Sequence, residues 1–353
     1  MSQTTQGGPE RLKVSISMGE TAITLFGVDT RDYYFSSDVM ADVEARFWER
    51  FQPDGASISI TLRGMAEAMG SEMLYRNHCI PSVKTPRVRK PEDVYELRVP
   101  DPLKDGRLPI VLEALVKLKE RLDGRTGVGA GMAGPVSVAI AVCGAENFLR
   151  WTRRYPDEVR RLMEVVTEGN NRYIDELGKR GIVGLSFSDP VASTDLLGHK
   201  QFLEFSLPYF TENVRHGGEV LGKNPGTHIC GHTRGIWEDI MGSGVSAFSV
   251  DNVEDLAEAK EVMGNSVALI GNVPPVNVLN LGKEEDIKRS VAECILKAHD
   301  SPKGYVLGSG CQVPLFTPAG NVEAYIRWGK ELGKLPIDTE RLQRITEGDG
   351  AAA

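Results

Sequence analysis

The sequence predicts an α/β fold, specifically a (β/α)8 TIM barrel with an N-terminal arm or cap. The chain has 353 residues, which fits one such barrel, since these commonly take about 200 to over 400 residues. Short apolar runs alternate with amphipathic helical stretches, a pattern typical of a parallel sheet with helical crossovers. Polar residues repeatedly follow the apolar runs, as expected where the strands of a parallel barrel end at one face.

The predicted strands share a short apolar run followed by a turn or a polar residue. They lie at 56–61, 127–133, 183–187, around 219–221 and 227–229, and at 247–250, 266–270 and 305–307. Helices are predicted within 103–122 and, as a pair, over 146–179. The polar residues that follow strands are Asp189, His228, Cys230, Asp251, Asn272 and Cys311. No G-x-G-x-x-G turn follows a strand, which disfavours a dinucleotide-binding fold.

The pattern divides the chain into three parts. Residues 1–55 fit the strand–helix alternation poorly and include a predicted helix over 37–51. We expect them to form an arm or cap that packs on the barrel or on a second subunit. Residues 56–340 form the predicted barrel. Residues 341–353 end in small residues and are expected to be a disordered tail.

Composition excludes several classes of function. The net charge of −8 argues against a basic face for nucleic acid. No apolar stretch approaches the roughly 20 residues that span a bilayer, and the first residues lack the pattern of a signal peptide. We therefore expect a cytoplasmic protein without membrane association. Five cysteines are too few and odd in number for a disulfide framework, so thiols remain available as core residues or metal ligands.

The clearest candidate site is the segment His228-Ile229-Cys230. Residues i and i+2 of a strand point to the same face, so both side chains can reach one ion. Imidazole and thiolate together suit zinc, and a catalytic zinc site keeps one exchangeable position. Cys311 follows another predicted strand after Gly308-Ser309-Gly310, whose glycines allow the backbone to bring the thiol inward. The alternative is that the motif is accidental and that these thiols are buried core residues.

Several motifs together resemble one family. They are Gly131 to Pro135, Ser188 to Ser193, Thr227 to Gly231, Phe248 to Asp251, Leu269 to Asn272, Gly310-Cys311, Thr317-Pro318 and Asn321-Val322. They resemble the uroporphyrinogen decarboxylase-like superfamily, in particular its zinc-dependent corrinoid methyltransferases. That branch includes the O-demethylase methyltransferases and the methylcobamide:coenzyme M methyltransferases. The resemblance covers roughly residues 60 to 330, and His-x-Cys with a distant Gly-Cys is its most specific part.

The resemblance implies a ligand set for zinc. His228, Cys230 and Cys311 match the three zinc ligands of that branch. An acidic residue after the next strand resembles a fourth, exchangeable ligand, and the matching residue is Asp251, where relatives carry Glu. The alternative for Asp251 is a helix N-cap before Val253. The Arg-rich N-terminal segment of the decarboxylases has no counterpart in the first 70 residues, which argues against porphyrinogen decarboxylation.

The resemblance also implies a reaction. Zinc would act either on a substrate thiol, which it holds deprotonated as a methyl acceptor, or on an ether oxygen as the methyl group leaves for cobalt. The corrinoid would be carried by a separate partner protein, because its binding signature, Asp-x-His-x-x-Gly, is absent and Gly226 stands where the Asp belongs. We expect O-demethylation of a methoxylated aromatic rather than methylation of a coenzyme M-like thiol. A homodimer is compatible with the resemblance.

Two further residues are candidates for catalysis. Asp189 could orient a metal-bound group or accept a proton, and its alternative is a turn or cap residue. Asn272 could donate a hydrogen bond to the substrate, with a turn role as its alternative. Two other functions stay open at this point. One is a metal-free porphyrinogen-type decarboxylase, and the other is a non-catalytic barrel with a closed structural zinc site.

Overall fold

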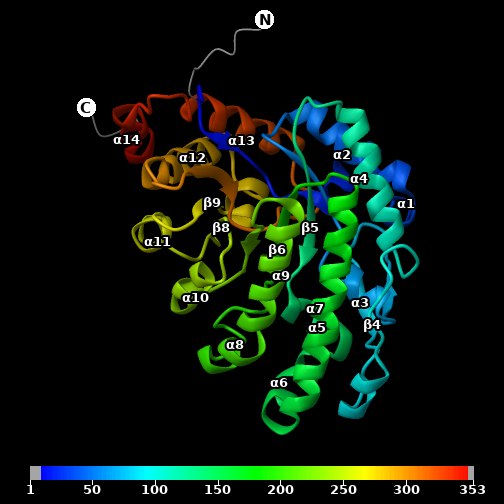
Figure 1. Cartoon of the computed structure of the whole chain (residues 1–353). Coiled ribbons are helices and arrows are strands. Elements are labelled where there is room, and N and C mark those ends of the chain that lie inside the picture. The colour runs from blue at the N-terminus through cyan, green and yellow to red at the C-terminus, as the bar shows by residue number, and fades with distance from the viewer. Residues whose placement is uncertain (1–8, 349–353) are drawn as a thin grey trace, which may run out of the picture.

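The structure is a computed structural model that describes residues 9–348 (Figure 1). Eight parallel strands form one curled sheet wrapped by helices, which confirms the predicted (β/α)8 barrel. The strands in their order around the sheet are β1 (Lys13–Val14), β10 (Tyr305–Ser309), β9 (Ala268–Val273), β8 (Ala247–Ser249), β7 (Gly226–His228), β6 (Gly184–Ser188), β5 (Val128–Ala133) and β2 (Ala56–Ser59). Their carboxyl ends define the mouth of the barrel.

The barrel closes at a seam between β1 and β2, the two ends of the hydrogen-bonded order. Asp54 bridges this seam. Its backbone N–H donates to the carbonyl of Val14 at 2.8 Å, and its carboxylate accepts the Val14 N–H at 2.8 Å. Arg11 holds the same carboxylate through bonds of 2.5 and 2.8 Å. A cavity of about 200 Å³, here called the seam cavity, lies beside these strands, and Glu44 and Trp48 are among its lining residues.

Helices surround the sheet because their apolar faces pack onto it. They are α1 (Thr30–Phe35), α2 (Ser37–Phe51), α3 (Gly64–Ala68), α4 (Leu108–Leu122), α5 (Pro135–Cys143), α6 (Ala145–Arg154), α7 (Pro156–Lys179), α8 (His199–Phe205), α9 (Leu207–Leu221), α10 (Trp237–Gly242), α11 (Leu256–Met263), α12 (Glu284–Ala298), α13 (Ala319–Leu332) and α14 (Thr339–Glu347). Short 3-10 helices cover Gly19–Leu25, Pro91–Glu96 and Arg234–Ile236, and a π-helix, η4, covers Pro275–Asn280. α2 spans the predicted 37–51, with Ser36 accepting the Val39 N–H as its N-cap.

Four predicted boundaries need correction. Residues 1–55 are not wholly outside the barrel, because β1 pairs with β10 as a barrel strand. A two-residue strand is too short to show alternation, which explains why the sequence did not reveal it. Residues 219–221 end α9 instead of belonging to a strand, and β9 extends through Asn272 to Val273. α14 reaches Glu347, so the predicted disordered tail is helical over 341–347, and residues 349–353 lie outside the described part.

A β-hairpin that the sequence did not predict extends from the mouth side of the barrel. It consists of β3 (Glu72–Leu74) and β4 (Ser82–Thr85). The tip is anchored by Asn77, whose side chain bonds to Asp29 at 2.5 Å and to the Thr30 N–H at 3.0 Å. The ring of His78 lies 5.9 Å from that of Phe316, in the loop after β10. Within residues 9–348, none of the helices combines the length and apolar character required to cross a bilayer.

Candidate metal centre

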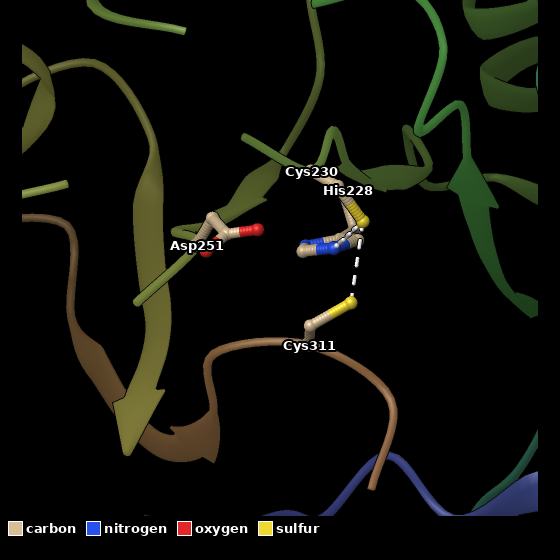
Figure 2. A group of neighbouring side chains, drawn as sticks. All are labelled: His228, Cys230, Asp251 and Cys311. Atoms are coloured by element: carbon tan, nitrogen blue, oxygen red, sulfur yellow. Dashed lines mark hydrogen bonds between the residues drawn. The ribbon is translucent and has the colours of Figure 1, made fainter. Parts of the chain in front are cut away.

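Four side chains from three strand ends converge at the mouth of the barrel (Figure 2). His228 is the last residue of β7, and Cys230 follows it by two positions. Asp251 lies two residues beyond β8, and Cys311 two residues beyond β10. One candidate ligand atom from each of the four lies within 4.8 Å of the others. The structure therefore brings together all four residues that the sequence suggested as ligands.

The parallel sheet explains why these distant residues meet. β7 pairs with β8, and β8 with β9, which pairs with β10, so their carboxyl ends lie along one arc of the mouth. Close approach of the loops depends on Gly310, before Cys311. A Cβ atom on Gly310 would lie 2.6 Å from the backbone nitrogen of Asn252, inside the loop that carries Asp251. Glycine is therefore the residue that lets these two loops pack together.

The imidazole of His228 is oriented for metal binding. Its Nδ1 lies 3.1 Å from the carbonyl oxygen of Ser249 on the neighbouring strand. A carbonyl only accepts, so Nδ1 carries the proton in the neutral ring and Nε2 keeps its lone pair. Nε2 faces the sulfur of Cys230 at 3.0 Å. A backbone carbonyl that fixes the tautomer in this way is the usual support of a metal-binding histidine.

The two thiols are close but not bonded. Their sulfur atoms are 3.2 Å apart, whereas a disulfide bond is about 2.05 Å long. Either sulfur can be the donor in the hydrogen bond between the two thiols. This bond, opposed by burial and aided by His228, lowers the pKa of Cys311. The same hydrogen bond raises the pKa of Cys230. A thiol with a lowered pKa is more readily deprotonated to the thiolate, which is the metal-binding form.

The group fits a zinc ion. Zinc prefers thiolate and imidazole ligands, with zinc–sulfur bonds of about 2.3 Å. An ion bonded to both sulfurs would require them to separate by only about half an ångström. Hard cations such as Mg²⁺ and Ca²⁺ prefer all-oxygen sites, so this donor set favours zinc over them.

Asp251 holds the two loops around the metal group together. It is 6% exposed, and its Oδ2 accepts the Gly231 N–H at 2.8 Å while its Oδ1 accepts the Val253 N–H at 3.0 Å. The alternative role as a helix N-cap is wrong. α11 begins after Asp255, whose own carboxylate accepts the first free N–H groups of that helix. Figure 2 shows the carboxylate of Asp251 directed toward the other three side chains.

Asp251→Asn is expected to weaken zinc binding by about 10- to 100-fold without unfolding the protein. The amide removes the negative charge and replaces one acceptor oxygen by a donor, which then faces a backbone N–H. Zinc affinity measured by competition with a chelating dye checks this prediction. Asp255→Asn is the matched control, because it changes a carboxylate of the same loop that caps α11. Equal zinc affinities for Asp251→Asn and wild type would exclude Asp251 as a ligand.

Asp189 is buried and directed at a helix, as its cap alternative predicted. It is 1% exposed. Its Oδ1 accepts the N–H and the hydroxyl of Ser137 at 2.8 and 2.6 Å, and Oδ2 accepts the Val136 N–H at 3.2 Å, so it caps the start of α5. Burial raises its pKa to about 6, against the opposing effect of these bonds. A role in orienting a metal-bound group stays a prediction.

Asn272 supports the loop that carries Asp251. Its Nδ2 donates to the carbonyl of Asp251 at 3.1 Å and to that of Glu254 at 3.0 Å. The side chain is 8% exposed, and its Oδ1 lies 3.7 Å from the thiol of Cys294. Within the described residues, the contacts of Asn272 therefore hold the Asp251 loop in position. A hydrogen bond from Asn272 to substrate stays a prediction.

The N-terminal segment supports the Cys311 loop. The sequence did not indicate this contact. Val313 N–H donates to the carbonyl of Ser17 at 2.8 Å, and the Gln312 side chain donates to that of Met18 at 3.3 Å. Glu20 is buried beside them and accepts the hydroxyl of Tyr34. Burial, the largest effect, raises the pKa of Glu20. No local motif marks these residues, because they act only once β1 lies beside β10.

Comparison with known proteins finds methyltransferases and a decarboxylase that are similar to this chain. The family model described as uroporphyrinogen decarboxylase (URO-D) matches residues 7–332. A methylated-thiol–coenzyme M methyltransferase of Methanosarcina mazei is 29% identical over 299 residues, covering 84% of this chain and 78% of the relative. A methylcobamide:CoM methyltransferase of Methanosarcina barkeri is 28% identical over 295 residues, covering 82% and 83%. A uroporphyrinogen decarboxylase of Methylobacillus flagellatus is 25% identical over 300 residues, covering 83% and 82%.

A solved structure is also similar. It is a methyltransferase from Methanosarcina mazei, with a TM-score of 0.82 and 25% sequence identity. The similarity covers 92% of this chain and 95% of that one. Most of the described fold is therefore shared with it.

Proposed function

This chain belongs to the uroporphyrinogen decarboxylase (URO-D) family, and we propose that it is a zinc-dependent enzyme transferring a methyl group from the cobalt of a partner corrinoid protein to a small thiol. The predicted resemblance to the corrinoid methyltransferase branch is confirmed, since the proteins that are similar to this chain include methyltransferases. The observation that carries the zinc proposal is the convergence of two thiols, an imidazole and a carboxylate within 4.8 Å.

His228, Cys230 and Cys311 would hold the zinc ion, with Asp251 as an exchangeable fourth ligand. When bound, zinc would lower the pKa of a coordinated substrate thiol and hold it as a nucleophilic thiolate. The protein itself orients the side chains that would bind the metal. Ser249 fixes the imidazole, and the two N–H bonds to Asp251 keep its carboxylate satisfied when a substrate takes its place. Exchange at this position therefore leaves no buried carboxylate without partners.

A thiol acceptor has more support than the methoxylated aromatic that the sequence favoured. Two of the relatives are named for coenzyme M, a thiol, and the expected O-demethylation gains no support from them. A metal-free decarboxylase has less support, because such an enzyme does not need two thiols and an imidazole arranged around one point. A structural zinc site has less support because a closed site has no reason to place its ligands at the mouth of a barrel.

The direct test uses methylcobalamin as the methyl donor and zinc-loaded protein. We expect methylation of 2-mercaptoethanesulfonate or 2-mercaptoethanol, measured as thioether by mass spectrometry and as loss of the methylcobalamin spectrum. Protein stripped of metal by a chelator is the control and should lose this activity until zinc is restored. Vanillate with Co(I) corrinoid tests the aromatic alternative. Demethylation of vanillate with no methylation of either thiol would contradict the proposal.

A further inference from the structure

We propose that the loops after β8, β9 and β10 form an apolar docking surface for the partner protein that carries the corrinoid. Its members are Val253, Val276, Leu281 and Phe316, together with Ile80 at the hairpin tip, and they are here called the rim patch. This inference rests on the proposed function, because it identifies the partner by the corrinoid that it must deliver.

The rim patch contains the two most exposed large apolar side chains of the described residues. Leu281 is 71% exposed and Phe316 is 65% exposed, the two highest values among them. Val253 and Val276 are 50% and 48% exposed, and Ile80 is 38% exposed. Single exposed apolar side chains are common on protein surfaces, but several gathered at one place usually mark a binding surface.

Hydrogen bonds tie together the loops that carry these side chains. Thr317, next to Phe316, donates to the side chain of Asn280 at 3.3 Å. Asn321 donates to the carbonyls of Leu279 and Gly282, both at 3.0 Å, on either side of Leu281. Asn272 ties the loop of Val253 to the end of β9, ahead of Val276. The hairpin tip joins the same surface through the contact between His78 and Phe316.

The backbone of Phe316 indicates that its exposure has a function. Its φ is +64°, a left-handed conformation that is unfavourable for a bulky residue. The Phe316 N–H donates to the Thr24 hydroxyl at 3.1 Å, which helps to hold this conformation. A strained residue that leaves a large aromatic ring in solvent does not serve the core. Strain of this kind is characteristic of ligand and partner sites.

The position of the rim patch identifies its occupant. Val253 follows the candidate ligand Asp251 by two residues, and Phe316 follows Cys311 by five. Transfer of a methyl group requires methyl-cobalt to reach an acceptor thiol at the metal group, so the protein that holds the cobalt must cover the loops around it. Apolar residues at the centre of such an interface contribute most of its affinity. We therefore assign this surface to the corrinoid protein and not to a second copy of this chain.

The test compares two methyl donors. The variant Phe316→Asn/Leu281→Ser removes the two most exposed side chains, and Asn is tolerated at a positive φ. With a corrinoid protein that the wild type demethylates, we expect the KM for that protein to rise at least about tenfold, as for loss of a central interface contact. With free methylcobalamin, kcat/KM should remain unchanged. Val183→Ser is the matched control, because Val183 is 59% exposed but precedes β6, at the opposite end of the barrel.

Direct binding of the corrinoid protein is measured in parallel by biolayer interferometry, with melting temperatures to verify folding. Weaker binding of the double variant alone, with Val183→Ser unchanged, supports the proposal. Equal losses with both donors would place the residues in the reaction site, and no loss with either would remove them from the interface. A wild-type dimer that dissociates in the double variant would assign the surface to a second copy. Binding without any thiol methylation would contradict the proposed function while supporting the docking surface.

Discussion

Cys311→Ser is expected to remove zinc and to lower kcat/KM for methyl transfer by on the order of a thousandfold, the equivalent of several kcal/mol of metal catalysis. A serine hydroxyl is not a zinc ligand of the kind found in such sites, and it would leave His228 and Cys230 with only the exchangeable Asp251 to complete the site. The fold should survive, because the loop of Cys311 is held by Val313, Gln312 and Gly310 through contacts that do not involve the thiol. Zinc content, the rate with methylcobalamin and the melting temperature measure these three effects.

Cys143→Ser is the matched control for Cys311→Ser. Cys143 is a buried thiol on α5, and burial raises its pKa to about 12, so it is an unreactive thiol. This variant should retain zinc and full activity even where packing costs some stability. Zinc retained by Cys311→Ser would remove Cys311 from the ligand set. Unfolding of Cys311→Ser on loss of zinc would instead favour a structural metal site.

Glu44→Gln is expected to stabilise the protein at pH 8 by on the order of 4 kcal/mol. Glu44 is 5% exposed beside the seam cavity and accepts the Tyr33 hydroxyl at 2.8 Å. Burial, opposed by that bond, raises the pKa of Glu44 from 4.5 to about 8. The unfolded chain therefore loses this proton from pH 4.5 upward, while the folded chain keeps it to about pH 8. Within that window the folded state binds more protons, so wild-type stability falls as pH rises.

Urea unfolding at a series of pH values tests the Glu44 prediction. The difference in unfolding free energy between Glu44→Gln and wild type should be small near pH 4.5, the ordinary pKa of this side chain, and should grow toward pH 8. Glu49→Gln is the control on the same helix, because Glu49 is an exposed partner of Arg125 at 3.1 Å. Such surface pairs contribute at most about 1 kcal/mol. A pH-independent difference for Glu44→Gln would mean that Glu44 is ionised in the folded protein.

The barrel and the metal group were predictable because both have short-range signatures. Strands of three to six residues with polar residues at their ends repeat along the chain, and parallel topology places all those ends at one mouth. His228 and Cys230 share one strand-end face, so their spacing predicts that both side chains can reach one ion. Cys311 and Asp251 are distant in sequence, yet each follows a strand of the same sheet. Their convergence therefore follows from the predicted topology without any side-chain coordinates.

The direction in which a polar side chain points was not predictable in the same way. Asp189 and Asp251 both follow barrel strands, but Asp189 caps α5 while Asp251 lies in the metal group. The difference depends on which backbone N–H groups lie nearby after the helices have packed. The same holds for the burial of Glu44, which lies in the segment that the sequence predicted to be an N-terminal arm or cap.

Local periodicity and spacing were thus sufficient for the barrel, the order of its parts and the candidate ligands His228, Cys230 and Cys311, whereas Asp251 was suggested only by the family resemblance. Packing alone decided the pairing of β1 with β10, the seam that Asp54 bridges, and the cluster of apolar residues around Phe316 and Leu281. The physical reason is the range of the interactions involved. Alternation and capping depend on neighbours along the chain, whereas a two-residue strand, a buried carboxyl group and a shared surface depend on residues that are brought together only by the folded barrel.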